Sequence, residues 1–517
     1  MIIPKPTKCE IKDSLLTLES PIKMYSEQLM IGVLELLKNL DKNARITDIR
    51  SKADIVFLPS AGTNGDEYRI ICDESGITVF SSSPALTVSA LSTLRQIAIE
   101  TEGAVSFPVC DIIDRPRFSW RGLSVDVCRH FFEIPELYKI VDILCFYKFN
   151  RLHLHLSDDQ GFRIEINRYP KLNEIGSNRK SSLVKKGEGE VQDGVPCGGF
   201  YTKKEIKELV VYARNRGIEI VPEIDIPGHS SAITASYPEL CCCGEPTEVV
   251  TEYGIKDFSS RILCAGSDGV YEFIKSVLLE IVELFPFQYI HLGGDEAVKS
   301  EWKKCPRCRA RMKTLGIKNT EGLQSYMFNV FSDFLKSMGR KAVFWNDGLT
   351  RRTDPDALCQ LWTPRFVKSI RPTVRSINHG RKAIISYFDS LYFDYPFSMT
   401  PLKKTYNTVV VPRGVKAEAV SSVLGVEATI WTEWITDREK LWYNLLPRLA
   451  AISEVAWSNE ADRDYKDFLS RLPDHYAFYE KEGYPFAKNK EKSGFFIKNW
   501  LTSLKFMFKD GDIELKQ

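Results

Sequence analysis

Two adjacent carboxylic acids, Asp295 and Glu296, are the residues of this sequence best suited to acid–base chemistry. They follow residues 291–294 (HLGG), where two glycines let a ligand or another backbone approach closely. Neighbouring carboxyl groups repel each other's charge, so one pKa rises and an acid becomes available near neutral pH. An Asp-Glu pair that merely begins a helix would look similar, because the helix dipole favours acids there. The apolar run and the glycines before the pair favour the chemical interpretation.

Other acidic and aromatic residues also lie next to short apolar runs, and together they form a set that suits a carbohydrate. Indole rings stack on the C–H faces of pyranose rings, while carboxylates and arginine hydrogen-bond hydroxyl groups. A single tryptophan at the end of such a run is usually a core residue, but three are less easily explained by packing. The other members of the set are Arg121, which begins the first run, and Asp158, His229, Trp345, Trp362, Tyr392, Asp394, Trp431 and Glu433.

The residues that must position this set follow a repeating pattern from about residue 112 onwards. Short apolar runs alternate with amphipathic helical patterns, for example at 135–147 and 203–217. Eight such runs predict a protein of the α/β class with a (β/α)8 TIM barrel, in which functional groups gather at the carboxyl ends of the strands. An open doubly wound sheet is the alternative, but it would normally carry a glycine-rich turn where this chain has residues 128–132 (CRHFF). The expected strands are 122–127, 151–156, 219–226, 289–292, 341–345, 358–362, 383–386 and 428–431.

Two further units flank the expected barrel domain of residues 112–465. Residues 1–111 predict a small α/β domain with a supporting role, because nothing in them suggests catalysis. Residues 466–517 are polar and aromatic, and we expect a helical tail that packs on the barrel. The elements expected in the small domain are helices at 26–40 and 84–99 and strands at 53–59, 68–72 and 76–80.

The composition bounds the class of protein and its partners. Of the 517 residues, 44% are hydrophobic and 27% are charged, which excludes a disordered tail, a collagen and a membrane channel. A net charge of +2 shows no large excess of positive charge of the kind that binds nucleic acid or an acidic membrane. The sequence contains no run of about 18 apolar residues, so we expect no transmembrane helix. Residues 1–10 lack the apolar core of a signal peptide, so we expect a cytoplasmic protein, or a secreted one whose leader has been removed.

The sequence contains 13 cysteines, an odd number, so at least one has no partner within the chain. Cys305 and Cys308 form a CxxC motif, which alone is a weak signal for zinc or redox chemistry. Cys264 and residues 241–243 (CCC) offer further thiols, but from a different loop. We expect the CxxC segment to be a loop that caps the barrel. A Cys242–Cys264 or Cys305–Cys308 disulfide is the alternative in an oxidising compartment.

Taken together and in this order, the motifs resemble glycoside hydrolase family 20, the β-N-acetylhexosaminidases. The resemblance extends from about residue 111 to 458, and the region before it is similar to that family's small accessory domain. The motifs that carry it are residues 121–126 (RGLSVD), 129–131 (RHF), 155–160 (HLSDDQ), 227–229 (PGH), 291–296 (HLGGDE), Trp345, Trp362, Tyr392, 431–433 (WTE) and 447–448 (PR).

This resemblance implies an exo-acting enzyme that removes terminal β-linked GlcNAc or GalNAc from a glycan or oligosaccharide with retention of configuration. The family is one of the substrate-assisted exceptions among retaining glycosidases, because the sugar's own 2-acetamido oxygen attacks the anomeric carbon and forms an oxazolinium intermediate. No cofactor and no metal are expected. Family members of this size work as monomers or homodimers, so the oligomeric state stays open. The preference between GlcNAc and GalNAc also stays open, because the two sugars differ only in the configuration of one hydroxyl.

The resemblance also implies a role for each matching residue. Glu296 matches the general acid that protonates the leaving oxygen and later activates water. Asp295 matches the group that holds the acetamido N–H and stabilises the developing positive charge, and Tyr392 the hydroxyl that steadies the acetamido oxygen. Asp158 and His229 match a relay that tunes the proton affinity of Glu296. The residues matched to substrate binding are Arg121, Glu433 and Asp394 for the hydroxyls, and Trp345, Trp362 and Trp431 for the pocket walls.

Three alternatives to this interpretation make different demands on the same residues. A metal-dependent amidohydrolase would use His153, His155, His229 and His291 with nearby acids, and the metal content of the purified protein separates it from a family 20 enzyme. A sugar-binding protein without catalysis would keep the tryptophans but would not need Glu296. A disaccharide-releasing member of the same family would need a wider pocket.

Overall fold

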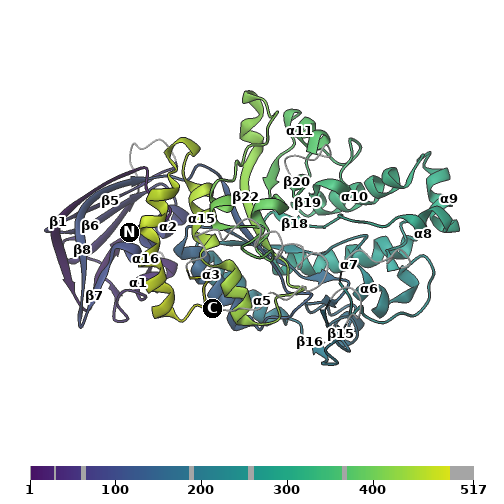
Figure 1. The fold of residues 1–517 in the computed structure, drawn as a ribbon, viewed down its shortest axis with the longest axis horizontal. Coiled ribbons are helices and arrows are strands. Elements are labelled where there is room, and N and C mark those ends of the chain that lie inside the picture. The colour runs from purple at the N-terminus through teal and green to yellow at the C-terminus, as the bar shows by residue number, and fades with distance from the viewer. Residues whose placement is uncertain are drawn as a thin grey trace.

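Figure 1 shows a sheet domain beside a larger barrel that carries long loops on its far side. The expected (β/α)8 barrel with a small α/β domain before it is confirmed. The computed structural model describes residues 2–27, 31–59, 66–185, 191–253, 261–363 and 370–488.

The small domain is an eight-stranded sheet whose helices α1 and α2 pack between the sheet and the barrel. Ser83 caps α2 by accepting a hydrogen bond from the Leu86 backbone N–H, and Pro84 is the first helical residue. Strand β8 continues to Asp114, so the expected boundary at residue 111 falls inside a strand. The elements are β1 Lys8–Glu19, β2 Lys23–Ser26, α1 Ile31–Leu37, β3 Arg45–Ile46, β4 Ile55–Pro59, β5 Tyr68–Asp73, β6 Gly76–Ser81, α2 Pro84–Ile97, β7 Ile99–Thr101 and β8 Ala104–Asp114.

The barrel closes from eight parallel strands in the order β10-β17-β18-β19-β20-β21-β22-β9. Each strand overlaps a predicted apolar run, but β22 begins at Val423, five residues before the predicted start, and β17 ends at Glu223, three residues before the predicted end. The strands are β9 Trp120–Asp126, β10 Arg151–His155, β17 Glu219–Glu223, β18 Tyr289–His291, β19 Lys341–Trp345, β20 Leu358–Leu361, β21 Ala383–Ile385 and β22 Val423–Ile430. The principal helices around them are α3 Ile134–Phe146, α5 Lys203–Asn215, α7 Asp268–Leu284, α10 Thr320–Ser337, α11 Ile370–Asn378, α13 Leu402–Tyr406, α14 Arg438–Leu445 and α15 Arg448–Trp457.

One helix of the ideal barrel is missing. Between β19 and β20, a segment described in full, the only helical element is the 3-10 turn η4, Asn346–Gly348. This short connection keeps Asp347 at the carboxyl end of β19, where it takes part in the site described below.

The interior of the barrel is layered. A small apolar cluster that includes Trp120, Val221 and Val343 fills one level. The next level toward the carboxyl ends of the strands is polar and centres on Glu223, which accepts hydrogen bonds from neighbouring strands. Nδ1 of His155 at 2.5 Å and Nε1 of Trp345 at 2.9 Å are hydrogen-bonded to its carboxylate. Nδ1 of His291, which accepts the Gly293 backbone N–H, and Nε2 of His153 lie 2.8 Å and 3.1 Å from the same carboxylate.

A buried ion pair joins the two domains. Nζ of Lys148 lies 2.9 Å from Oδ2 of Asp114, and both side chains are fully buried. Trp457 donates its indole N–H to the other oxygen of Asp114 at 2.8 Å. Because removal of one partner would leave the other charge buried without compensation, a substitution of either residue alone is expected to destabilise this junction.

Helix α16, Tyr465–Glu482, covers the junction between the domains. Phe478 stacks on Phe146 of α3 with ring centroids 4.1 Å apart, and Arg471 forms a buried ion pair with Glu454 of α15. The rest of the expected tail, residues 489–517, lies outside the described residues.

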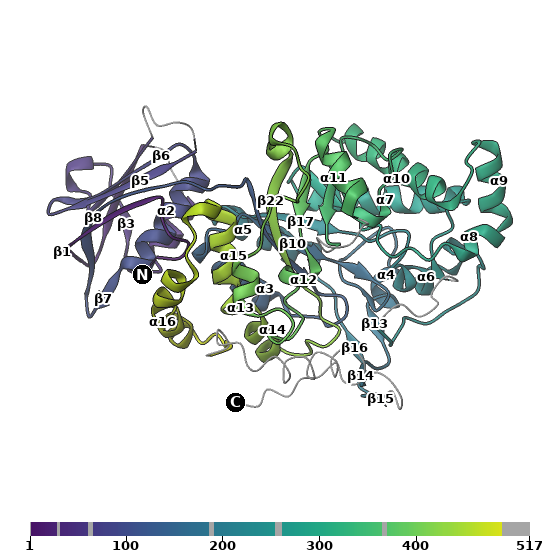
Figure 2. The same ribbon diagram turned by 45° about the horizontal axis from the view of Figure 1, so that its top comes forward.

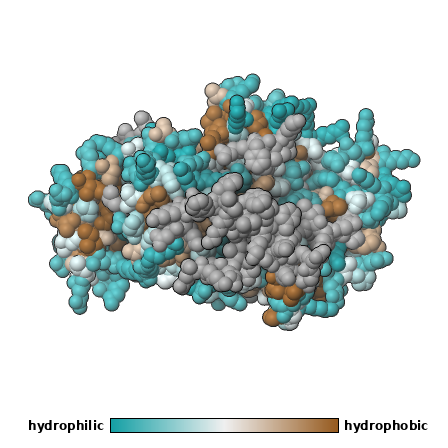
Figure 3. Space-filling model, in the orientation of Figure 1, coloured by the Kyte–Doolittle hydropathy of each residue, from teal (hydrophilic) through white to brown (hydrophobic). Residues whose placement is uncertain are grey.

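Long loops extend the barrel on the side away from the sheet domain (Figures 1 and 2). No helix in the described part of the chain is long and apolar enough to cross a membrane. On the face in Figure 3, the described hydrophobic residues form small separate groups among hydrophilic ones. The secondary structure in the loops comprises β11 Ser157–Asp158, β12 Gly161–Phe162, α4 Lys171–Glu174, β13 Asn178–Arg179, β14 Leu183–Lys185, β15 Val191–Gln192, β16 Cys197–Gly198, α6 Ser231–Ser236, η2 Pro238–Leu240, α8 Ser300–Lys304 and α9 Pro306–Thr314.

Candidate active site

The acid pair lies at the carboxyl end of β18 and faces His229, which follows β17. Nε2 of His229 is 3.7 Å from Oδ2 of Asp295 and 3.9 Å from Oε2 of Glu296. The Asp295 side chain is 16% exposed and that of Glu296 is 34% exposed. Glu296 is therefore the member of the pair that a leaving group can reach more easily.

Glycine is required in the turn that presents the acids. A Cβ atom at Gly293 would lie 1.7 Å from Oδ1 of Asp225, and φ there is +61°. The same Asp225 oxygen accepts the Gly294 backbone N–H at 2.9 Å. Glu296 itself has φ +45°, a conformation that non-glycine residues rarely adopt. The backbone N–H of Glu296 donates to Oδ2 of Asp347 at 3.0 Å, which holds this strained residue in place.

A chain of charges leads from Arg129 through Asp158 to His229. Asp158 Oδ2 lies 2.8 Å from the Arg129 guanidinium, and Asp158 Oδ1 lies 3.1 Å from Nδ1 of His229. Burial disfavours the charge on Asp158, but Arg129 and His229 hold its pKa well below the usual range. Burial likewise disfavours a charged His229, but Asp158 raises the pKa of His229 well above its ordinary value. These contacts therefore favour the positively charged form of His229.

Burial shifts both acids of the pair toward their protonated forms. Burial raises the pKa of Asp295 to about 7, and the carboxylates of Asp347 and Glu223 add to it against the opposing charge of His229. Burial also raises the pKa of Glu296, again against the charge of His229. Oδ1 of Asp295 is buried and accepts no hydrogen bond from any described residue. An acceptor left in this way is suited to an N–H donor on a ligand.

Aromatic rings surround the acids. Trp345 is almost fully buried and Trp431 lies 6.0 Å from it between ring centroids. Tyr392 lies 6.0 Å from Trp431, and the charge of Asp295 adds to burial in raising the pKa of Tyr392 well above its usual value. Trp362 donates its indole N–H to Oδ1 of Asp347 at 2.9 Å. The structure therefore brings together the three tryptophans and the tyrosine that the sequence singled out.

Asp394 and Glu433 complete the acidic side of the site. Burial and the charge of Glu433 raise the pKa of Asp394 well above its usual value. Burial also raises the pKa of Glu433, although the Arg129 guanidinium opposes this. The charge of Arg129 thus favours the ionised forms of both Asp158 and Glu433. Its guanidinium also lies 5.1 Å from the Trp431 ring.

The expectation for Arg121 is wrong. Arg121 lies near the amino end of β9, where Nε donates to the Lys148 carbonyl at 2.8 Å and a terminal nitrogen donates to the Phe118 carbonyl at 2.7 Å. The candidate active site is at the opposite, carboxyl end of the strands. Arg129, which follows the carboxyl end of β9, occupies the position expected for the arginine of the site.

We expect Arg129→Gln to lower kcat/KM at least about tenfold, mainly through KM, because a charged hydrogen-bonding group is lost. Arg121→Gln is the matched control and should leave KM unchanged in the folded enzyme. Steady-state kinetics of both variants measure this, and a larger KM effect from Arg121→Gln would reverse the correction.

The histidines of the metal-hydrolase alternative do not form one ligand set. His153, His155 and His291 lie around Glu223 inside the barrel, each with a ring nitrogen within 3.1 Å of its carboxylate, whereas His229 is hydrogen-bonded to Asp158 at the barrel mouth. Although burial opposes its ionisation, the three histidines hold the pKa of Glu223 well below the usual range. The sequence did not reveal this role of Glu223, because nothing in residues 219–223 (EIVPE) distinguishes this glutamate from Glu219 at the other end of the strand.

Acid–base groups and aromatic rings at the carboxyl ends of barrel strands place the protein among the barrel hydrolases. The sequence model of the glycosyl hydrolase family 20 catalytic domain matches residues 118–460. A β-hexosaminidase of Akkermansia muciniphila is 35% identical over 429 residues, which cover 80% of this chain and 84% of that protein.

Solved structures agree with this match. The β-N-acetylhexosaminidase of Bacteroides fragilis superposes with a TM-score of 0.83 at 29% identity, over 96% of this chain and 99% of that one. The family 20 exo-β-N-acetylglucosaminidase of Vibrio harveyi, solved with N-acetylglucosamine, gives a TM-score of 0.83 at 28% identity, over 95% of this chain and 78% of that one. The chain belongs to glycoside hydrolase family 20 and is a hydrolase, as the resemblance of its motifs implied.

Proposed function

We propose that the protein is an exo-acting β-N-acetylhexosaminidase that releases terminal β-linked GlcNAc or GalNAc with retention, through an oxazolinium intermediate. The observation that carries the proposal is the pairing of Glu296 with Asp295. Both carboxyl groups lie within 3.9 Å of the same His229 nitrogen, on one side of the site, whereas ordinary retaining sites place their carboxyl groups about 5–5.5 Å apart across the sugar ring. An internal nucleophile removes the need for a protein nucleophile.

In the first proposed step, the 2-acetamido oxygen forms a bond to the anomeric carbon as the glycosidic C–O bond breaks. Glu296 gives its proton to the leaving oxygen. Asp295 accepts the acetamido N–H and stabilises the positive charge that develops on the oxazolinium. Tyr392 donates its hydroxyl to the acetamido oxygen and aligns it for attack.

In the second proposed step, water attacks the anomeric carbon from the face that the leaving group vacated. The Glu296 carboxylate takes a proton from this water, and the bond between the anomeric carbon and the acetamido oxygen breaks. The acid is thereby restored for the next cycle. Two inversions at the same carbon give net retention.

The proposed binding residues fall into a polar group that contacts the sugar hydroxyls and an aromatic group that contacts the ring and the acetamido methyl. Arg129, Glu433 and Asp394 carry the charges and hydrogen-bonding groups for the hydroxyls, and the indoles of Trp345, Trp362 and Trp431 pack against the ring and the acetamido methyl. The N-acetylglucosamine bound to the Vibrio harveyi relative supports a sugar of this type.

The substrate class is tested by release of p-nitrophenol from the β-GlcNAc, β-GalNAc and β-glucose glycosides. We expect turnover of the two acetamido sugars and none of the glucoside, which lacks the internal nucleophile. The ratio of the first two rates measures the preference at the epimeric hydroxyl. Comparable turnover of the glucoside would contradict the proposal.

Asp158→Asn is expected to shift the profile of kcat/KM against pH toward higher pH. Without the Asp158 carboxylate, the pKa of His229 is lowered, because Asp158 is the main charge that raises it. The positive charge of His229, which lowers the pKa of both Asp295 and Glu296, is then present less of the time as the pH rises. Asp158 itself raises the pKa of Glu296, but less than His229 lowers it.

Both limbs of kcat/KM against pH should therefore shift to higher pH, because these limbs report groups of the free enzyme. The two acids are coupled, so the apparent pKa values belong to the pair. Limbs that stay in place, or move to lower pH, would show that His229 does not tune the acids.

A further inference from the structure

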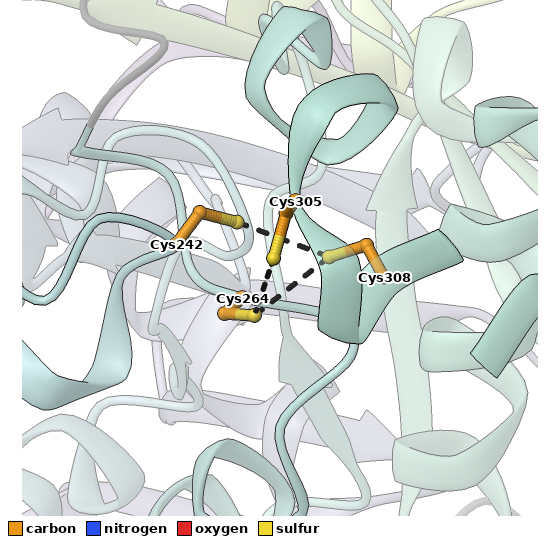
Figure 4. A group of neighbouring side chains, drawn as sticks. All are labelled: Cys242, Cys264, Cys305 and Cys308. Atoms are coloured by element: carbon orange, nitrogen blue, oxygen red, sulfur yellow. Dashed lines mark hydrogen bonds between the residues drawn. The ribbon is translucent and has the colours of Figure 1, made fainter. Parts of the chain in front are cut away.

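Four cysteines that are distant in the sequence meet in the loops that carry the active-site residues (Figure 4). Cys242 and Cys264 belong to the loop after β17, whereas Cys305 and Cys308 flank the start of α9, in the loop after β18. The Cys308 sulfur lies 3.8 Å from that of Cys242 and 3.7 Å from that of Cys264, and the Cys264 and Cys305 sulfurs are 3.8 Å apart. The thiols of the two loops therefore do not lie apart as expected from the sequence.

The spacing of the sulfur atoms matches a tetrahedral ion site. Zinc binds thiolate sulfur at about 2.3 Å, so the edge of a regular ZnS4 tetrahedron is about 3.8 Å. The three distances above lie at this value, and all four sulfurs lie within 4.8 Å of one another. A disulfide would bring two sulfurs to about 2.05 Å, which these contacts do not approach.

The surroundings of the cluster suit bound thiolates. Cys264, Cys305 and Cys308 are buried, and Cys242 is partly buried. The Gly266 backbone N–H donates to the Cys264 sulfur, and such outer contacts orient and stabilise metal ligands. The Arg307 guanidinium donates to the Cys241 carbonyl at 2.9 Å and places a positive charge beside the sulfurs.

The two loops are fitted closely at the cluster. A Cβ atom at Gly266 would lie 2.2 Å from the Arg307 carbonyl carbon and 2.3 Å from the Cys308 nitrogen, so only glycine allows this approach. The indole N–H of Trp302 donates to the Leu263 carbonyl at 2.9 Å, next to Cys264.

We propose that Cys242, Cys264, Cys305 and Cys308 bind one Zn²⁺ in a closed, structural site. Four soft sulfur ligands in a tetrahedral arrangement favour Zn²⁺ over hard cations such as Mg²⁺ and Ca²⁺. All four positions are taken by protein, so the ion has no place for water or substrate and takes no part in glycoside hydrolysis. Binding displaces the protons of the thiols, which pass to solvent.

The ion would cross-link the loop after β17 and the loop after β18, both of which carry residues of the proposed active site. The β17 loop carries His229 and the β18 loop carries Asp295 and Glu296. The connection is short, because the Leu263 backbone N–H donates to the Pro227 carbonyl at 3.1 Å, two residues before His229. Zinc is thus expected to stabilise the β17 and β18 loops against each other.

The metal content of the full chain, purified without added metal under reducing conditions, tests the proposal. Mass spectrometry of the elements should find about one zinc per chain in the wild type and only background zinc in Cys305→Ser/Cys308→Ser. Cys243→Ser is the matched control, because it removes a thiol next to Cys242 that is outside the tetrahedron, and it should keep its zinc.

Cobalt substitution gives a readout that does not depend on the stability of a variant. Refolding of the wild type with Co²⁺ should produce the intense visible bands and sulfur-to-cobalt charge transfer of a tetrahedral thiolate site. Chelation of zinc should lower the Tm of the wild type, while the double variant should not respond to the chelator.

Three results would overturn the proposal. They are zinc retained by the double variant, a wild type whose four thiols form two disulfides in the non-reduced mass spectrum, and a site filled by iron instead of zinc. Because the substrate-class and pH tests above do not depend on zinc, failure of this inference leaves the proposed hydrolase function untouched.

Discussion

Glu296→Gln is expected to lower kcat by about 10²- to 10⁴-fold on a substrate with a poor leaving group, because glutamine cannot protonate the leaving oxygen. Burial raises the pKa of Glu296, which favours the protonated form that a general acid needs. Rates on an unactivated disaccharide measure the effect. Glu301→Gln, a substitution in the nearby helix α8, is the control and should keep wild-type kcat.

The leaving group provides the internal check on this assignment. A p-nitrophenolate leaves with little help from an acid, so Glu296→Gln should lose much less activity on formation of the intermediate from the p-nitrophenyl glycoside. An equal loss on both substrates would show that Glu296 serves some purpose other than proton donation.

Asp295→Asn is expected to lower kcat by about 10²- to 10³-fold, the range found when a group that stabilises developing charge is removed. Asparagine keeps the size of the side chain but loses the negative charge opposite the oxazolinium. The loss should fall mainly on kcat, because this charge is needed more in the transition state than in the bound substrate. Steady-state kinetics on the β-GlcNAc glycoside measure it.

The pH profile separates this role from simple support of the fold. Burial raises the pKa of Asp295 to about 7, so its carboxylate form decreases as the pH falls below neutrality. The acidic limb of kcat/KM should therefore disappear in Asp295→Asn, whereas a structural defect would lower activity equally at every pH. A kcat within a few-fold of the wild type would contradict the role assigned to Asp295.

The sequence predicted the barrel well because its strands are buried on both faces and read as short apolar runs. It did not reveal β1 and β8, which form one edge of the small sheet. Residues 8–15 of β1 are all exposed, so this strand carries no alternating pattern over most of its length. It also did not reveal that the fifth barrel helix is replaced by η4, because strand patterns do not specify what connects them.

The site was predictable where a residue directly follows a strand, as with His229 and the acid pair. Arg121 was misplaced because it is the first arginine of its motif, while the rule about carboxyl ends favours Arg129, which comes after the strand. The cysteine cluster was not predictable, because Cys242 and Cys264 meet Cys305 and Cys308 only after two separate loops fold together. Sequence spacing carries no information on such a meeting.

Substrate-assisted catalysis is tested most directly by a series of β-GlcNAc glycosides whose acetamido methyl is progressively fluorinated. Fluorine withdraws electrons from the acetamido oxygen and weakens it as a nucleophile while the leaving group stays the same. The account predicts that kcat/KM falls steeply with each fluorine and that the first sugar released has the β configuration. Rates that are independent of fluorination would show that the acetamido oxygen is not the nucleophile, and the central claim would be wrong.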